Sequence, residues 1–339
     1  MNAINQLENF KTKIDKELGK FLNKKLKESE KISPETKKLV EVIKDIVLRG
    51  GKRLRPAFVY FAYKACGGKK EKAIIYTSQA IEFLHTFALI HDDIIDKSEK
   101  RRGKPAVHQI LGEPGTILAG DLCFVFADEI FTNSAFKDKI IREVQKIYDL
   151  LREEVVFGQY LDVLVAKEKT VAEEKIMKIL EYKSGKYTIE RPLHLGAALA
   201  EAPLKTFKVF SQYGIPLGIA FQIQDDILGM FGRSEESGKP VDSDLKEGKK
   251  TLLVVKALEA LKGKERKKFL GLLGNQSSTL EDLAWVREII KKTDSLDYSR
   301  NLAKKLIQKA KEAIKEYPLH AEGKEYLLGI ADYMLERRY

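Results

Sequence analysis

Helical periodicity along almost the whole chain is the feature that most constrains its fold. Between Lys37 and Leu48, apolar residues recur at the i, i+3, i+4 spacing that buries one face of a helix. This stripe consists of Leu39, Val42, Ile43, Ile46 and Val47. Few segments alternate polar and apolar residues, and the sequence contains no Asn-Gly or Asp-Gly pair typical of a tight hairpin. The chain is therefore predicted to be all-α.

The same pattern predicts a series of helices separated by glycine-containing breaks. The expected helices are 37–48, 74–96, 119–135, 140–166, 171–183, 204–231, 251–261, 280–292 and 298–317. The expected breaks are at Gly50-Gly51, Gly67-Gly68, Gly112–Gly115 and Gly232–Gly248. No stretch resembles a linker, so residues 1–339 are expected to form one domain whose central helices are apolar on nearly all sides.

Composition excludes several classes of protein. Lys and Arg number 61 and Asp and Glu number 50, a net charge of +11, but the basic residues are interleaved with acidic ones. Aromatic residues do not alternate with them, so nucleic-acid binding is not expected. The longest uncharged stretch, 209–224, is shorter than the ~20 residues that span a membrane. Two cysteines, Cys66 and Cys123, suit no disulfide framework. A soluble, intracellular protein is expected.

Two aspartate clusters indicate a metal site. Asp92 and Asp96 are one helical turn apart, so they share a face and repel each other unless a cation holds them. Asp225 and Asp226 end a second apolar segment about 130 residues later. Oxygen ligands from few side chains suit Mg²⁺, which keeps its remaining sites for water and substrate phosphates. Two unrelated acidic helix ends are the simpler alternative.

Basic residues near glycine breaks complement these aspartates. They comprise Lys52, Arg53, Arg55, Arg101, Arg102, Lys183, Lys186, Lys239, Lys249 and Lys250. Each pair alone is more typical of a solvated surface, but together they offer two kinds of anion site, one bridged by metal and one made of Lys and Arg only. His85 lies seven positions before Asp92 and therefore on nearly the same helix face, although a lone buried histidine usually serves packing.

The motifs carrying these residues, in this order, resemble the trans-isoprenyl diphosphate synthase (polyprenyl synthetase) family, most closely its geranylgeranyl and farnesyl diphosphate synthases. The resemblance runs from about Lys37 to the end of the chain. The motifs are GGKRLRP at 50, EFLHTFALIHDDIID at 82, RRGKPAVH at 101, GDLCF at 120, GQYLD at 158, KSGKYT at 183, FQIQDDILG at 221 and GKPVDSDLKEGKKT at 238.

This resemblance implies a fold, an activity and a set of site residues. The fold is a bundle of long antiparallel helices around a deep central cavity. The activity is prenyl transfer, the condensation of isopentenyl diphosphate with dimethylallyl, geranyl or farnesyl diphosphate. Asp92, Asp96 and Asp225 match the ligands of two or three magnesium ions. The family positions that contact the allylic diphosphate or stabilise its cation are matched by Arg101, Lys183, Ser184, Gln222, Lys239 and Lys249. The family's pocket for isopentenyl diphosphate is matched by Lys52, Arg55, His85 and Arg102.

Further expectations follow from the same resemblance. Asp162 matches a supporting acidic residue near the metals. Residues 1–36 are expected to form an N-terminal helical arm and 232–248 an active-site lid. The second aspartate motif has Gly229 where a third aspartate is common, and Asp244 is a candidate for a supporting contact. A cytoplasmic homodimer without stable membrane insertion is implied.

Product length is predicted from the helix that carries Asp92. Helix geometry places Ala88 one turn before Asp92 and nearly in line with it, whereas Phe87 lies about 140° away. In the family pattern, an aromatic residue five positions before the motif, without one at four, accompanies a twenty-carbon product. The pair Phe87 and Ala88 therefore predicts geranylgeranyl diphosphate, with farnesyl diphosphate as an intermediate that partly escapes. Plain core packing is the alternative for Phe87.

Three other functions compete with this interpretation. A terpene cyclase binds one diphosphate, and the second basic group at Lys52 and Arg55 speaks against it. A His-Asp metal phosphohydrolase needs more histidines than the five present. A non-catalytic subunit of a prenyl synthase is expected to lack one aspartate cluster, and both are present here.

Overall fold

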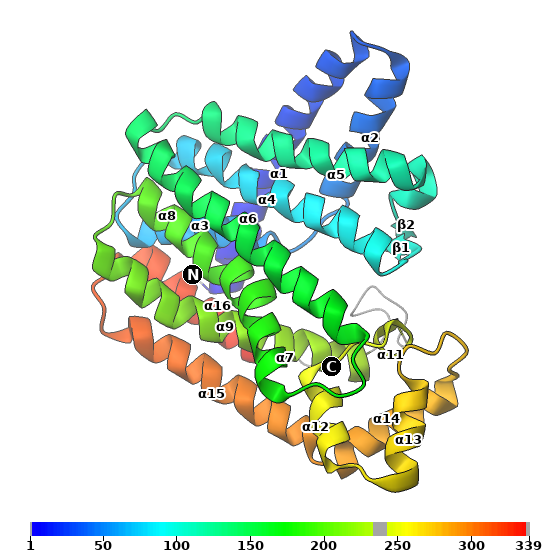
Figure 1. Cartoon of the computed structure of the whole chain (residues 1–339). Coiled ribbons are helices and arrows are strands. Elements are labelled where there is room, and N and C mark those ends of the chain that lie inside the picture. Colours follow the sequence, from blue (N-terminus) through cyan, green and yellow to red (C-terminus); the bar gives the residue numbers. More distant parts are fainter. Residues whose placement is uncertain (1, 233–242, 337–339) are drawn as a thin grey trace. The chain divides into compact units, whose positions relative to one another are not determined.

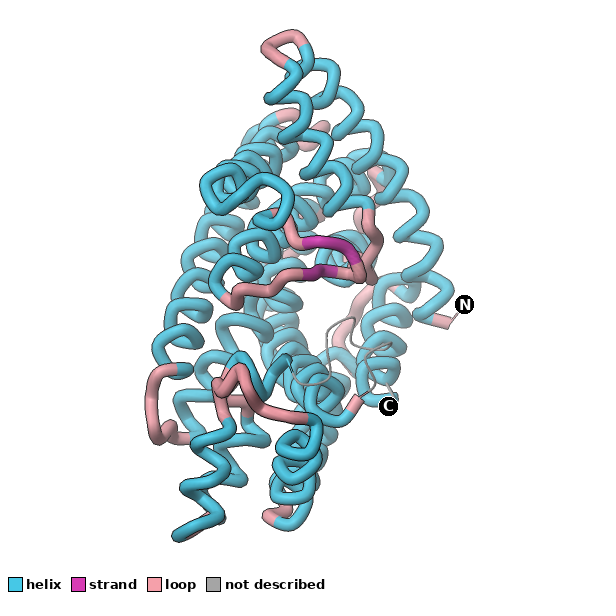
Figure 2. Tube along the Cα trace, turned by 90° about the vertical axis from the view of Figure 1, so that its right-hand side faces the viewer, coloured by secondary structure: helices cyan, strands magenta, loops and turns pink. Residues whose placement is uncertain are grey.

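A computed structural model describes residues 2–232 and 243–336, and within these ranges the protein is all-α apart from one short hairpin (Figures 1 and 2). This confirms the predicted fold class. The first helices and strands are α1 (Ala3–Glu30), α2 (Pro34–Leu48), α3 (Leu54–Ala65), α4 (Glu71–Ile95), β1 (Lys100–Arg101), β2 (Lys104–Pro105), α5 (His108–Thr132) and α6 (Asp138–Ala166). The later helices are α7 (Glu173–Leu180), the π-helix η1 (Glu181–Glu190), α8 (Arg191–Leu199), α9 (Leu204–Phe231), α11 (Ser243–Glu247), α12 (Leu252–Ala260), α13 (Gly263–Leu272), α14 (Leu280–Lys292), α15 (Ser295–Lys315) and α16 (Ala321–Glu336).

Helix bounds agree closely with the sequence pattern where a helix is uniform. The bounds of α9 and α14 are those predicted. α5 begins eleven residues earlier than expected, because the break predicted at Gly112–Gly115 is a kink inside a longer helix. Gly112 has the left-handed φ of 68° at this kink, and Pro114 follows it. The helix predicted over 171–183 ends at Leu180 and continues as η1.

The hairpin of β1 and β2 was not predicted from the sequence. Its strands pair Lys100 with Pro105 and Arg101 with Lys104, which leaves Arg102 and Gly103 as a two-residue turn. Both turn residues have positive φ, 53° and 74°. Such a turn suits the right-handed twist of a hairpin, and Asn-Gly or Asp-Gly is its usual signal. Arginine in the first position hides that signal.

The described chain divides into two compact units. The first comprises residues 1–148, 192–207 and 319–329, and the second comprises 149–191, 208–318 and 330–339. In the first unit α4 and α5 pack antiparallel along their length. Residue contacts run in opposite directions along the two helices, from His91 at Ile117 to Phe87 at Phe124 and Phe83 at Phe126.

α1 belongs to the core of the first unit. Its apolar residues follow the i, i+3, i+4 spacing and are buried, while its other face is charged. The buried positions include Leu7, Phe10, Ile14, Leu18, Phe21 and Leu22. The Phe21 ring lies 5.1 Å from Phe83 of α4 and 5.5 Å from Phe126 of α5. The segment expected as an arm therefore supports the helix that carries the first aspartate cluster.

Two helices of the described residues, α4 and α5, are long and apolar enough to cross a membrane by length and composition alone. The most apolar part of α4 is two-thirds buried inside the protein, as expected for a core helix. The corresponding part of α5 is only one-third buried. Among its exposed apolar side chains are Ile110, Ile117, Leu118 and Val125.

In the second unit, glycines let η1 approach α9 closely. A Cβ atom on Gly218 of α9 would lie 2.6 Å from the Cα of Gly185 in η1, which is too close for any side chain. The backbones at Gly185 and Gly218 therefore touch directly, and this contact places the KSGKYT motif beside the FQIQDD motif.

Candidate active site

The first aspartate cluster lies at the C-terminal end of α4. Asp96 is the C-cap residue, and its backbone N–H donates to the Asp92 carbonyl at 2.8 Å. Both carboxylates therefore stand at the negative end of the helix dipole, where a cation is favoured and an anion is not. The last turn of α4, which is fully described, carries no lysine or arginine. This placement favours a cation between Asp92 and Asp96.

Asp93, the middle aspartate of the cluster, has a different role. It is fully buried and accepts two hydrogen bonds from Arg101, from Nε at 2.8 Å and Nη2 at 2.7 Å. Burial acts to lower the pKa of Arg101, but the carboxylates of Asp93, Asp92 and Asp96 outweigh it and raise that pKa. Arg101 is thus held next to the cluster in a fixed, bidentate geometry.

A second basic group lies in the same unit, on the loop between α2 and α3, in the first turn of α3 and on α4. Lys52 is exposed and Arg55 is half-buried, while Arg53 between them is buried. The Arg55 Nη1 lies 3.1 Å from Nε2 of His85 on α4. Burial, followed by the nearby charges of Arg55 and Arg102, holds the pKa of His85 well below its ordinary value of 6.5. His85 is therefore neutral, and its Nε2 accepts the Arg55 hydrogen bond.

The β1–β2 hairpin is tied to this loop. Arg102 donates from Nη1 to the Gly50 carbonyl. Arg49 donates from Nη1 to the carbonyl of Pro105 at 2.9 Å and from Nε to Asp45 at 2.8 Å. Because the bonds to Gly50 and Pro105 join segments more than fifty residues apart, Arg102 lies beside the loop that carries Lys52 and leads into α3, where Arg55 lies.

The second unit brings three predicted residues into one hydrogen-bonded chain. The Ser184 hydroxyl donates to the amide oxygen of Gln222 at 2.8 Å, and the Gln222 amide nitrogen donates to Asp226 at 2.9 Å. Lys183 forms an ion pair of 2.6 Å with Asp162 of α6. A pocket opens beside them, lined by Asp162, Ile176, Ile179, Leu180, Lys183, Ser184, Gln222, Asp226, Lys249, Lys250 and Thr251.

Other predicted residues of the second unit lie around this pocket. Lys249 pairs with Glu247 at 2.9 Å. Asp225 precedes the pocket-lining Asp226 on α9 and is half-buried. Lys239 and most of the expected lid, 233–242, lie outside the described residues.

The predicted chain-length residues lie where α4 meets α5. The Phe87 ring is 4.9 Å from that of Phe124 on α5, and 4.6 Å from that of His91. Ala88 is half-buried on the adjacent position of α4. A Cβ on Gly120 of α5 would overlap the His91 ring, so the GDLCF motif makes room for this aromatic group.

The aspartate carboxylates suit a hard cation whose coordination shell is completed by substrate. In residues 2–232 and 243–336, no three His, Cys, Asp or Glu side chains gather as a preformed metal site. A pair of aspartates one turn apart suits magnesium, because that ion retains several waters and binds through one or two carboxylates plus substrate phosphates.

Sequence reasoning missed the buried acidic partners of the arginines. Asp93 follows Asp92 directly in the sequence, yet its position on the helix is rotated by about 100° from that of Asp92 and its side chain is buried. This rotation is the signal in the sequence that could have separated the role of Asp93 from that of Asp92. Glu82 and Asp15, which bind Arg53, lie far from it in sequence, and no local pattern marks them.

Comparison with known proteins decides the family. The family model described as polyprenyl synthetase matches residues 36–290. The chain belongs to the polyprenyl synthetase family. This confirms the resemblance seen in the motifs, and with it the prediction of a prenyltransferase.

Individual members of the polyprenyl synthetase family are similar over nearly the whole chain. A geranylgeranyl diphosphate synthase of Sulfolobus acidocaldarius is 38% identical over 91% of this chain and 93% of its own. A short chain isoprenyl diphosphate synthase of Methanothermobacter thermautotrophicus is 36% identical over 91% and 92%. The crystal structure of geranylgeranyl pyrophosphate synthase from Corynebacterium glutamicum, complexed with isoprenyl diphosphate and magnesium, matches with a TM-score of 0.94 at 29% identity, over 98% and 99% of the two chains.

Proposed function

We propose that this protein is a geranylgeranyl diphosphate synthase, which condenses isopentenyl diphosphate with dimethylallyl, geranyl and farnesyl diphosphates. One observation favours a condensing enzyme over a terpene cyclase. The first unit holds an acidic cluster with Arg101 beside it and, separately, a basic group of Lys52, Arg55, His85 and Arg102. Two separate diphosphate sites suit a condensing enzyme, whereas a cyclase needs one.

The allylic diphosphate is the substrate that ionises. Its C–O bond breaks, the diphosphate leaves with the electron pair, and an allyl cation remains. Asp92, Asp96 and Asp225 would hold two or three magnesium ions, whose positive charge stabilises the leaving group. Arg101, Lys183, Lys249 and Lys239 add charge-assisted hydrogen bonds to the diphosphate oxygens.

Isopentenyl diphosphate supplies the nucleophile. With its diphosphate bound by Lys52, Arg55 and Arg102, its double bond attacks the cation and forms the new C–C bond. Gln222 stabilises the cation through its amide oxygen, and its amide is oriented by hydrogen bonds with Ser184 and Asp226. The released diphosphate takes the proton lost from the condensed product. A neutral His85 leaves the charge of Arg55 available for the second diphosphate.

Product length is assigned to the α4–α5 contact. Phe87 is held against Phe124 and His91, and Ala88 is small. A chain that grows along α4 past Ala88 is stopped at twenty carbons by the Phe87 ring. Farnesyl diphosphate is the fifteen-carbon intermediate.

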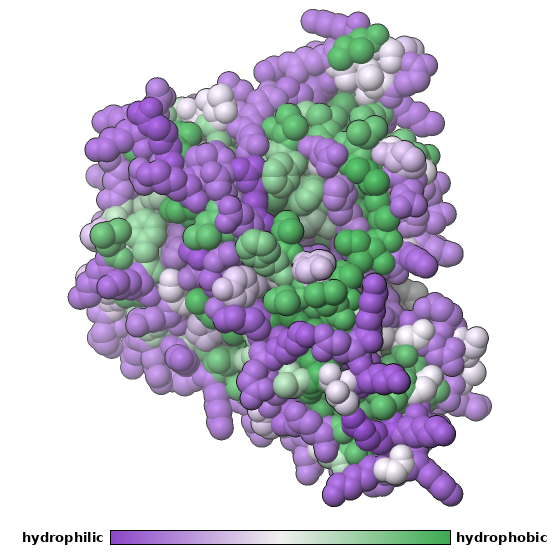
Figure 3. Space-filling view, viewed as in Figure 1, coloured by the Kyte–Doolittle hydropathy of each residue, from purple (hydrophilic) through white to green (hydrophobic). Residues whose placement is uncertain are grey.

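The assembly is assigned as a cytoplasmic homodimer. Figure 3 shows apolar residues gathered along α5, where Ile117, Leu118 and Val125 are 43%, 59% and 56% exposed. Contiguous exposed apolar surface of this kind marks an interaction site. A second copy of the chain covers it.

The test is incorporation of labelled isopentenyl diphosphate into each allylic primer, with magnesium and with excess chelator, followed by chromatography of the dephosphorylated products. Magnesium-dependent formation of geranylgeraniol is expected from all three primers. Full incorporation in excess chelator, or cyclic hydrocarbons as the main products, would overturn the proposal.

A further inference from the structure

Arg53 is the one arginine of the GGKRLRP segment that does not face the substrate site. Its side chain is 1% exposed, whereas Lys52 before it is exposed. Arg53 is the N-cap residue of α3 and has a φ of 52°, in the left-handed region that a side chain other than glycine rarely adopts. Such a backbone conformation persists only where the surrounding contacts stabilise it.

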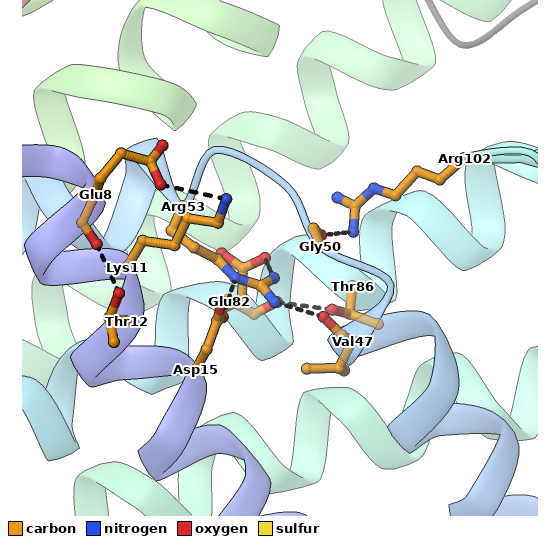
Figure 4. Close-up of polar contacts among 10 residues, drawn as sticks. All are labelled: Glu8, Lys11, Thr12, Asp15, Val47, Gly50, Arg53, Glu82, Thr86 and Arg102. Carbon is orange, nitrogen blue, oxygen red and sulfur yellow. Dashed lines mark hydrogen bonds and ion pairs between the residues drawn. The ribbon is translucent and has the colours of Figure 1, made fainter. Parts of the chain in front are cut away.

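Three acceptors from three different elements hold the Arg53 guanidinium (Figure 4). Nε donates to Asp15 of α1 at 2.8 Å, Nη1 donates to Glu82 of α4 at 2.5 Å, and Nη2 donates to the Val47 carbonyl of α2 at 2.6 Å. Glu82 is 4% exposed and Asp15 is 34% exposed. The buried cation of Arg53 is thus neutralised by two carboxylates, one from α1 and one from α4, that are not among the residues assigned to substrate or metal.

The cluster of Asp15, Arg53 and Glu82, called the anchor below, lies among the residues assigned to isopentenyl diphosphate. Arg53 directly follows Lys52 and precedes Arg55 by two residues, while Glu82 precedes His85 by one helical turn on α4. Thr86 donates to the Glu82 carbonyl at 2.9 Å in that turn. Through Glu82, the anchor fixes the loop relative to the helix that carries His85, and through Asp15 it fixes the loop relative to α1.

We propose that Asp15, Arg53 and Glu82 are positioning residues for the isopentenyl diphosphate site, so that the N-terminal helix α1 sets the affinity for one of the two substrates. The inference rests on the proposed function and adds to it a role for α1. The anchor acts on Lys52, Arg55 and His85 and does not touch substrate. The allylic site, built from other residues, is independent of it.

The experiment compares Asp15→Asn with Glu17→Gln. Both substitutions remove one carboxylate charge from α1 at a similarly exposed position, but Glu17 pairs with Lys20 and lies outside the anchor. Asp15→Asn is expected to raise KM for isopentenyl diphosphate about fivefold, the equivalent of weakening one charge-assisted hydrogen bond. KM for farnesyl diphosphate and kcat should change less than about twofold, and Glu17→Gln should match the wild type.

A second variant, Arg53→Lys, keeps the charge but not the three-armed geometry. It should raise the same KM, and adding Asp15→Asn to it should have little further effect, because both act through one anchor. Equal changes in both KM values, or a lower melting temperature with both KM values unchanged, would overturn the inference while leaving the proposed function intact.

Failure of the proposed function is separable from failure of this inference. If the wild type condenses no substrate, the proposed function falls. Calorimetric titration of isopentenyl diphosphate alone into the wild type and Asp15→Asn then tests the anchor directly. A weaker Kd in the variant supports it, and equal Kd values overturn it.

Discussion

Single residues in this protein take opposite roles at neighbouring positions. Asp92 and Asp93 are adjacent, yet one is half-buried at a helix end and the other is fully buried against Arg101. Lys52 and Arg53 differ in the same way. In each pair one side chain is more accessible to solvent, and the buried member shapes the backbone or fixes a neighbouring arginine, because adjacent side chains point in different directions.

Replacing Asp92 should remove most of the activity. Asp92→Asn keeps the size of the side chain but removes one negative charge from the proposed metal site. Loss of one stabilising group at the leaving diphosphate is expected to lower kcat/KM by about 10²–10³. Steady-state kinetics measures this, with Asp149→Asn as the control because Asp149 pairs with Arg152 on α6. A variant within twofold of the wild type would remove Asp92 from the metal ligands.

The partly buried His85 should make folding stability depend on pH. Its pKa in the folded protein is far below 6.5, so below pH 6.5 the unfolded chain binds a proton there that the folded chain does not. The free energy of unfolding should therefore fall as pH drops below about 6.5, by up to ~1.4 kcal/mol per pH unit from this group. His85→Gln should remove this contribution, because glutamine does not titrate.

Urea unfolding of the wild type and His85→Gln at pH 7.5 and pH 5.5 measures that difference. The wild type should lose more stability between the two pH values than the variant does. Equal losses would mean that His85 protonates as readily in the folded state as in the unfolded state.

At the scale of elements, close helix contacts determine what each motif does. The α4–α5 pair brings Phe87 to Phe124, and the η1–α9 pair brings Ser184 to Gln222. These contacts require small residues, such as Gly120 and the Gly185–Gly218 pair. These three glycines serve helix packing, whereas Gly103 of the RRGKPAVH motif serves a turn.

The α4–α5 contact should set the product length. Phe87→Ala removes the ring proposed to stop the chain and should shift the products beyond twenty carbons, whereas Ala88→Phe should shorten them toward farnesyl diphosphate. Chromatography of the dephosphorylated products gives the distribution. Phe83→Leu, a core substitution beside Phe21 and Phe126, is the control and should leave the lengths unchanged. Unchanged products in both test variants would place the stop elsewhere.

At the scale of the whole molecule, α5 presents apolar surface that the first unit does not bury. Leu118→Arg should place a charge in the proposed dimer interface and yield monomers, because an unpaired charge in a buried interface is costly. Sedimentation velocity measures the oligomeric state. Leu204→Arg is the control, since Leu204 is an isolated apolar residue, 82% exposed at the start of α9. A wild-type monomer, or a dimeric Leu118→Arg, would contradict this assembly.

The sequence by itself determined most of the helices, the motifs and the family, but helices α3, α8, α13 and α16 were not predicted from it. Helical periodicity is local, so it placed α9 and α14 to the residue, and the order of eight motifs identified the polyprenyl synthetase family. Prediction from the sequence failed where the usual turn residues were absent, as at the Arg102-Gly103 turn, and where a helix continued past a predicted break, as at Gly112.

Only the tertiary structure decided which charged residues are buried and what they bind. Arg53 meets Asp15 and Glu82 from positions 38 and 29 residues away, and Arg49 meets a carbonyl 56 residues away. Such partners depend on how the helices pack, and periodicity carries no information about packing between distant segments. The same holds for Asp93 and Asp92, whose separate roles follow from the direction in which α4 turns each carboxylate.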